Sequence, residues 1–277
     1  MSQSSDPFIM KALYPTLLFL LFSCTAMTRP LIVAHRGASA EAPGNTIPAF
    51  ELAWGQSADA IEGDFHLSQD SEIVCIHDRD TKRIAEQKLV VKESNFESLR
   101  VLQFRKDFSK GHADLHIPSF AEVAQTVPED GKFYIEIKSD SKILPHLEKA
   151  LKRSNLRKEQ IVLISFKTKV IEAAKKADPD MKAVWLTSLK KTRKGQFEPS
   201  AAEVIRQLKE LNADGVSVKA ISELTKSYIQ TIKAAGFEFH VWTVNTPEHA
   251  KQLAGYGVNS ITTDYPGRIL EAVKPGD

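Results

Sequence analysis

The residues best suited to acid/base chemistry stand where apolar runs end. In LIVAHRGASAEAPGNTIPAF, the run LIVA ends in His35 and Arg36, an imidazole beside a guanidinium. Such a pair at a strand terminus favours an anionic ligand, above all a phosphate. His77 ends the run IVCI in the same way. Two histidines on fixed backbone can act as general base and general acid near neutral pH, so the pattern predicts proton transfer beside a phosphate.

Three carboxylates follow the alternation of strands. Glu62 and Asp64 are two residues apart in AIEGDFH, and Glu136 and Lys138 are two apart in FYIEIK, so each pair shares one side of its strand. Inward carboxylates are costly unless a cation neutralises them. Oxygen ligands suit Ca2+ or Mg2+, so we expect these three carboxylates to hold one such ion. Glu62 with Asp64, or Glu136 with Lys138, would by itself be interpreted as a solvated or salt-bridged pair. The two pairs together with the histidines at strand ends favour an active site.

The other histidines and the cysteine give weaker signals. His66 shares the side of the first two carboxylates and is a candidate to line the pocket, whereas His240, inside an apolar run, is expected to be structural. Cys75 lies in IVCIHD and is expected to be a small buried hydrophobe. The remaining four histidines are expected to face solvent: His112, His116, His146 and His249.

Apolar, β-branched runs alternate with helical patterns along the chain, which indicates βαβ units and a parallel sheet. Nine runs can be counted: LIVAHRG, DAIEGDFHL, EIVCIHD, KFYIEIK, IVLISF, KAVWLT, DGVSV, FEFHVWTVN and NSITTDYP. EIVCIHD follows its predecessor after only a short turn, so it should be an antiparallel hairpin partner. Eight strands remain, which predicts an α/β protein with a (β/α)8 TIM barrel, whose active site forms at the C-terminal ends of the strands. A doubly wound open sheet is the alternative.

Residues 80–118 show no clean helical or strand period. We expect them to form an insertion beside the barrel mouth, where a small cap would shape access of substrate.

Residues 1–28 are predicted to be a signal peptide, because Lys11 precedes an apolar run from Ala12 to Phe22 that ends in small residues. The run is shorter than the roughly 20 residues of a membrane span. Cleavage near Ala26 would release a domain of residues 29–277 into the periplasm or medium. Alternatively, LFSC resembles a bacterial lipoprotein box, and Cys24 would then attach the protein to a membrane. A buried first helix is the less favoured interpretation.

The formal net charge of +2 comes from 37 basic and 35 acidic residues. This balance excludes a protein that coats nucleic acid, so anion binding must come from a local site for a small molecule. The sequence leaves the oligomeric state open.

The motifs AHRG, IEGDF, IHD, IEIK, SF, VWTVN and TDYP occur in an order and spacing that resembles the glycerophosphodiester phosphodiesterase family, from Arg29 to the C-terminus. The resemblance implies a (β/α)8 barrel, attack by the substrate's glycerol hydroxyl on phosphorus, and a cyclic phosphate that water opens. The products would be glycerol 3-phosphate and an alcohol. The roles it implies are His35 and His77 as the acid/base pair, Glu62, Asp64 and Glu136 as metal ligands, Arg36 and Lys138 as phosphate contacts, and Trp242 as a pocket wall.

One position departs from the family pattern. Gly44 stands where the family usually has glutamate in Pro-Glu-Asn-Thr, and Glu41 is a candidate substitute. The departure affects expected metal affinity and substrate range more than the reaction class. The same segment could simply open a helix, with Asn45 or Thr46 as its cap. Two alternatives remain: a lysophospholipase D or cyclising phospholipase, and a non-catalytic protein that binds phosphorylated polyols.

Overall fold

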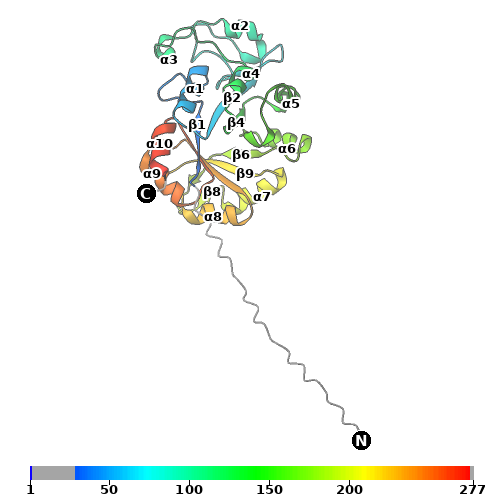
Figure 1. Cartoon of the computed structure of the whole chain (residues 1–277), viewed down its shortest axis with the longest axis vertical. Helices are drawn as coiled ribbons and strands as arrows, with labels where there is room; N and C mark the ends of the chain where they lie inside the picture. Colours follow the sequence, from blue (N-terminus) through cyan, green and yellow to red (C-terminus); the bar gives the residue numbers. More distant parts are fainter. Residues whose placement is uncertain (2–28, 275–277) are drawn as a thin grey trace.

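The computed structural model describes Met1 and residues 29–274 and contains a closed barrel of eight parallel strands (Figure 1). The predicted signal peptide and Cys24 lie outside the described residues. In barrel order the strands are β1 (Leu31–His35), β2 (Ala60–Leu67), β4 (Lys132–Ile137), β5 (Ile161–Ser165), β6 (Ala183–Thr187), β9 (Gly215–Lys219), β10 (Glu238–Trp242) and β11 (Ser260–Thr263). Because β1 pairs with both β2 and β11, the sheet closes. The predicted TIM barrel is confirmed, and the open sheet is wrong.

The short third strand, β3 (Ile73–Cys75), lies outside the barrel as predicted. It pairs antiparallel with the end of β2, and Phe65 is opposite Cys75. Cys75 is buried, as the apolar run around it indicates. The hairpin returns the chain alongside the last residues of β2, and His77 comes two residues after β3.

Helices surround the barrel (Figure 1). They are α1 (Ile47–Gly55), α4 (Phe120–Gln125), α5 (Leu144–Arg153), α6 (Thr168–Ala177), α7 (Ala201–Leu211), α8 (Lys226–Ala234), α9 (Pro247–Gly255) and α10 (Pro266–Val273). Helix α7 shows how local sequence sets the ends of a helix. Ser200 and Glu203 form a capping box at its start, and Asn212 in left-handed conformation ends it. Among residues 29–274, no helix is both long and apolar enough to cross a bilayer.

The short elements complete the fold. A small hairpin, β7 (Lys190–Lys191) with β8 (Phe197–Glu198), follows β6. Single 3-10 turns occur at η1 (Val91–Glu93), η2 (Ser141–Ile143) and η3 (Lys158–Gln160). These elements connect the barrel units and add no strand to the barrel.

Residues 80–118, called the insert below, contain η1 and two short helices, α2 (Phe96–Arg100) and α3 (Lys106–Ser109). The insert has its own apolar cluster, in which Leu99 and Ile117 pack with side chains that follow β2. Lys110 attaches it to the loop after β1, because its Nζ donates hydrogen bonds to the carbonyl oxygens of Ser39, Ala40 and Ala42 at 2.8, 3.0 and 3.4 Å.

Candidate active site

Three buried carboxylates meet at the C-terminal ends of β2 and β4. Glu62, Asp64 and Glu136 each offer an oxygen within 4.8 Å of the others, and their side chains are almost inaccessible to water. The parallel register places Asp64 opposite Glu136, so strand pairing brings them together. Oε1 of Glu62 and Oδ1 of Asp64 are buried without a hydrogen-bond partner among the described residues. Nζ of Lys138 lies 3.5 Å from Oδ1 of Asp64, an ion-pair distance that is too long for a hydrogen bond. Buried carboxylate oxygens that accept no hydrogen bond are costly, and this donor set therefore fits a hard divalent cation.

Burial and mutual repulsion act together on the pKa values of these carboxylates. Burial raises the pKa of Glu62 well above its ordinary value, and the charges of the other two carboxylates add to this effect. Burial and Asp64 raise the pKa of Glu136 to about 7. For Asp64 burial is outweighed by Arg36 and Lys138, and its pKa is lowered to about 2. A bound cation would remove the remaining repulsion.

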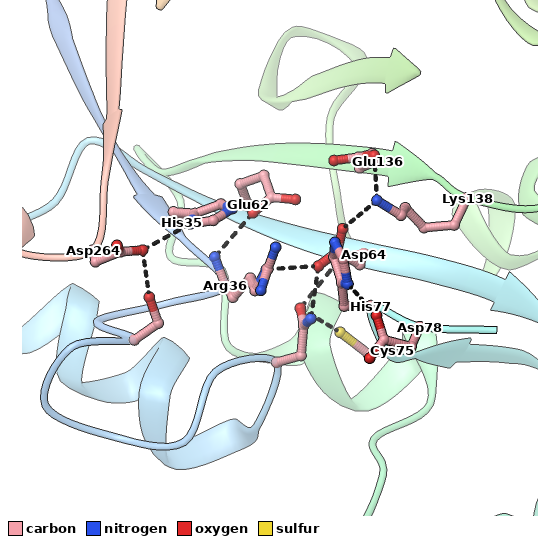
Figure 2. Close-up of polar contacts among 12 residues, drawn as sticks. His35, Arg36, Glu62, Asp64, Cys75, His77, Asp78, Glu136, Lys138 and Asp264 are labelled. Carbon is pink, nitrogen blue, oxygen red and sulfur yellow. Dashed lines mark hydrogen bonds and ion pairs between the residues drawn. The ribbon is translucent and has the colours of Figure 1, made fainter. Parts of the chain in front are cut away.

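Arg36 and Lys138, the predicted phosphate contacts, lie against this cluster (Figure 2). Nε of Arg36 is 3.0 Å from Oδ2 of Asp64, and its backbone N–H donates to Oε2 of Glu62 at 2.9 Å. Nζ of Lys138 is 2.8 Å from Oε1 of Glu136. Arg36 has a positive φ of 57°, so the backbone turns sharply where β1 ends. The two cations and three carboxylates thus form one charged centre.

Each predicted acid/base histidine is held by an aspartate. Nδ1 of His35 is 2.7 Å from Oδ1 of Asp264, and Nδ1 of His77 is 2.6 Å from Oδ1 of Asp78. Nε2 is therefore the nitrogen that each ring has available for proton transfer. In the view of Figure 2, His35 lies beside Glu62 and His77 lies beside Asp64, so each ring adjoins a different carboxylate of the cluster. Burial lowers the pKa of His77 below 6.5, which favours its neutral form.

Asp264 is itself fixed by hydrogen bonds. Asn245 Nδ2 donates to its Oδ2 at 2.6 Å, and Ser39 Oγ donates to its Oδ1 at 2.8 Å. Burial would raise the pKa of Asp264, but the hydrogen bonds, above all with His35, lower it to about 2. Asp264 therefore stays charged and can stabilise a protonated imidazole. Sequence reasoning missed it, although the motifs TDYP and VWTVN contain both Asp264 and Asn245.

The loop before α1 contributes a second residue that sequence reasoning misread. Asn45, at a φ of 61°, does not cap the helix: its Nδ2 donates to Oδ2 of Asp64 at 2.8 Å. Its Oδ1 accepts from the backbone N–H of Asp64 at 3.1 Å. Thr46 precedes α1 but makes no side-chain capping bond. The amide of Asn45 therefore fixes the carboxylate at the centre of the cluster.

At position 44 a glycine stands where the family usually has a glutamate, so this position supplies no carboxylate to the site. A Cβ there would lie 3.2 Å from the Cβ atoms of Arg36 and Ser39, so the loop packs tightly around the glycine. Glu41 does not substitute, because its Oε1 accepts a hydrogen bond from Gln56 on the exposed surface.

An aromatic wall stands beside Lys138. Trp242, at the end of β10, packs edge-to-face with Phe166 at a centroid distance of 5.4 Å. Nζ of Lys138 lies 6.0 Å from the centre of the Phe166 ring. Phe166 belongs to the motif SF, for which the sequence predicts no individual role. Apolar carbon atoms of a substrate held by Lys138 would find these rings within reach.

The other histidines divide differently from the prediction. His66 is half-buried and bonds through Nε2 to the carbonyl oxygen of His77 at 3.2 Å, so it holds backbone near the site. His240 is structural as expected, between Ser260 and Glu238. His116 does not simply face solvent, because its Nε2 lies 3.0 Å from Oε1 of Glu122.

Comparison with known proteins gives a consistent assignment. The model of the glycerophosphoryl diester phosphodiesterase family matches residues 35–268. The chain is 30% identical over 253 residues to a glycerophosphodiester phosphodiesterase of Caldanaerobacter subterraneus, covering 90% of this chain and 99% of the relative. It is 26% identical over 264 residues to one of Bacillus subtilis, covering 90% and 87%.

The barrel also resembles solved structures. A phosphodiesterase of Oleispira antarctica, solved in complex with the product sn-glycerol-3-phosphate, superposes with a TM-score of 0.80. It shares 23% identity and covers 89% of this chain and 98% of its own. That likeness concerns the fold, whereas the family match spans the site. The chain therefore belongs to the glycerophosphoryl diester phosphodiesterase family.

Proposed function

We propose that the protein hydrolyses glycerophosphodiesters to glycerol 3-phosphate and an alcohol, using two histidines and one divalent cation. The observation that carries this proposal is the buried cluster of Glu62, Asp64 and Glu136, with two orphaned carboxylate oxygens, between two histidines that aspartates fix. A phosphodiester needs its charge offset and needs protons moved at two oxygens, and this arrangement supplies both.

Arg36 and Lys138 would bind the phosphoryl oxygens. Both side chains are about four-fifths buried, which strengthens their attraction for an anion compared with exposed groups. Glu62, Asp64 and Glu136 would hold one hard divalent cation, Ca2+ or Mg2+, which supplies Lewis-acid polarisation of a phosphoryl oxygen when bound. The Oleispira relative, solved with sn-glycerol-3-phosphate, supports a glycerophosphate ligand for this kind of barrel.

The histidines would divide the proton transfers. One Nε2 removes the proton of the substrate's own glycerol hydroxyl, whose oxygen attacks phosphorus. The other imidazolium protonates the alcohol oxygen as its bond to phosphorus breaks, and a cyclic phosphate remains. Water then opens the ring while the two histidines exchange roles, and glycerol 3-phosphate is released. Asp264 and Asp78 keep each ring in the tautomer that this exchange requires.

Substitution of the histidines tests the proposal. We expect His35→Ala and His77→Ala each to lower kcat for release of glycerol 3-phosphate by roughly 10²-fold or more, the contribution of a general acid or base. Circular dichroism should show an intact fold. His249→Ala, on α9 and outside both the carboxylate cluster and the two ion pairs that hold His35 and His77, is the matched control and should retain activity. Retained activity in both site variants would refute histidine catalysis and would favour another phosphodiester chemistry.

We further propose that residues 1–28 contain an export signal that is cleaved near Ala26 or, alternatively, before Cys24. The charge and apolar pattern of this segment support the proposal. Mass spectrometry of the chain purified from a producing cell would show a mature N-terminus near Thr28, or a lipid-modified Cys24. An intact Met1 on the exported or retained protein would contradict it.

A further inference from the structure

A cavity of about 350 Å³ lies between the loop after β1 and the insert. Arg36 and His77 belong to its lining, so it adjoins both the proposed phosphate contact and one proposed acid/base group. The insert adds an apolar wall that includes Phe104 and Phe108. The volume lies within the range of small-molecule sites. The function proposed above assigns no occupant to this space.

The cavity lining includes three cations, Arg36, Arg83 and Lys110, and two carboxylates, Asp107 and Asp264. Nζ of Lys110 bonds only to carbonyl oxygens among residues 29–274. Asp107, a carboxylate of the lining, is paired with Arg105 at 3.2 Å, and Asp264 is held by His35. Gly44 adds no side chain to the wall.

Arg83, on the insert, connects this wall to the acid/base group. Its Nε lies 2.7 Å from Oδ2 of Asp78, whose Oδ1 lies 2.6 Å from Nδ1 of His77. In the part of the chain that the structure describes, Nε is the only atom of Arg83 that makes a hydrogen bond. The two Nη groups bond to no described residue, and Arg83 belongs to the cavity lining although its side chain is half exposed.

We infer, on the basis of the proposed function, that the cavity receives the departing alcohol and that Arg83 selects hydroxyl-bearing alcohols over quaternary ammonium alcohols. A guanidinium donates hydrogen bonds to hydroxyl oxygens, whereas it repels a trimethylammonium group of like charge. Arg83 would thus bind the alcohol and position His77 through Asp78.

Hydrolysis of two substrates tests the inference: glycerophosphoglycerol, whose alcohol is a polyol, and glycerophosphocholine. We expect kcat/KM to favour glycerophosphoglycerol by about tenfold or more, the size of one charge-assisted hydrogen bond. Arg83→Gln should bring the ratio close to one, chiefly by raising KM for glycerophosphoglycerol. Lys82→Gln, an exposed neighbour outside the cavity lining, is the matched control and should keep the ratio.

A second variant keeps the test decisive if Arg83→Gln is poorly folded. Arg83→Lys keeps the positive charge but has a single nitrogen, which Asp78 would engage, so the ratio should again fall towards one. Equal or better turnover of glycerophosphocholine by the wild type would overturn the selectivity. Equal loss for both substrates in Arg83→Gln would show that Arg83 acts only through Asp78, and would overturn its contact with the alcohol. Hydrolysis of neither substrate by the wild type would instead refute the proposed function.

Discussion

The imidazole Nδ1 of His35 lies 2.7 Å from Oδ1 of Asp264, so a carboxylate after β11 fixes the ring that ends β1. These residues are 229 positions apart in the chain and meet because the barrel closes between β1 and β11. Barrel closure therefore brings Asp264 to His35.

Asp264→Asn should lower kcat by roughly 10²-fold or more, because an amide neither fixes the required tautomer nor stabilises the imidazolium. KM should change less than kcat, since Asp264 acts through His35. Steady-state kinetics check this, with Ser39→Ala as control, because it removes only one of the hydrogen bonds to Asp264. A kcat equal to that of the wild type would show that His35 needs no anionic partner.

A divalent cation should stabilise the folded protein. At a concentration 100 times its Kd, binding to the folded state adds about 2.7 kcal/mol to the free energy of unfolding. Thermal unfolding with Ca2+ or Mg2+, and then with chelator, measures the gain. Glu62→Gln should lose most of it, because one ligand charge is removed while its hydrogen bond with the Arg36 backbone can remain. An equal gain in wild type and variant would place the cation elsewhere.

The stability of the protein should fall at low pH in part because Glu122 becomes protonated. Burial would raise its pKa, but hydrogen bonds from Arg100, Ser119 and His116 outweigh burial and lower it from 4.5 to about 2. The folded state therefore binds this proton less readily than the unfolded chain. Its stabilising contribution is complete above pH 4.5 and is lost as the pH falls towards 2.

Glu122→Gln should accordingly be less stable than the wild type at pH 7, and the difference should shrink between pH 4.5 and 2. Urea unfolding at several pH values measures this. Glu148→Gln, which removes an exposed pair with Lys152, is the control and should show little difference at any pH. A constant difference for Glu122→Gln would contradict the assignment.

The insert should unfold separately from the barrel when its own core is weakened. Leu99 is fully buried in the insert's apolar cluster, so Leu99→Ala should cost about 2–5 kcal/mol. Hydrogen exchange should show faster exchange in residues 80–118 and unchanged protection of the barrel strands. Val101→Ala, at a highly exposed position, is the control. Equal loss of protection in both regions would mean that they unfold as one unit.

The fold was predictable because its signals are local. Each strand is a short apolar run, and the SQDS turn alone separates the hairpin strand β3 from the barrel strands. Alternation likewise placed Glu62, Asp64 and Glu136 on inward faces before any contact was known. These predictions needed only residue order and strand period.

The partners of the site residues were not predictable in the same way. Asp264 and Asp78 look like ordinary loop carboxylates in the sequence, and only the closed barrel shows which histidine each one holds. Asn45 resembled a helix cap, since capping and holding Asp64 demand the same amide group. His116 lay in a segment without period, where sequence gives no indication of its contact with Glu122.

Release of glycerol 3-phosphate tests the central claim most directly. The purified protein is incubated with glycerophosphoglycerol and glycerophosphocholine, with added Ca2+ or Mg2+ and with chelator, and glycerol 3-phosphate is measured enzymatically. We predict release that requires the cation and falls in His35→Ala and His77→Ala. Binding of the substrates without release would instead indicate a protein that only binds phosphorylated polyols, and undiminished release in chelator would contradict the cation site.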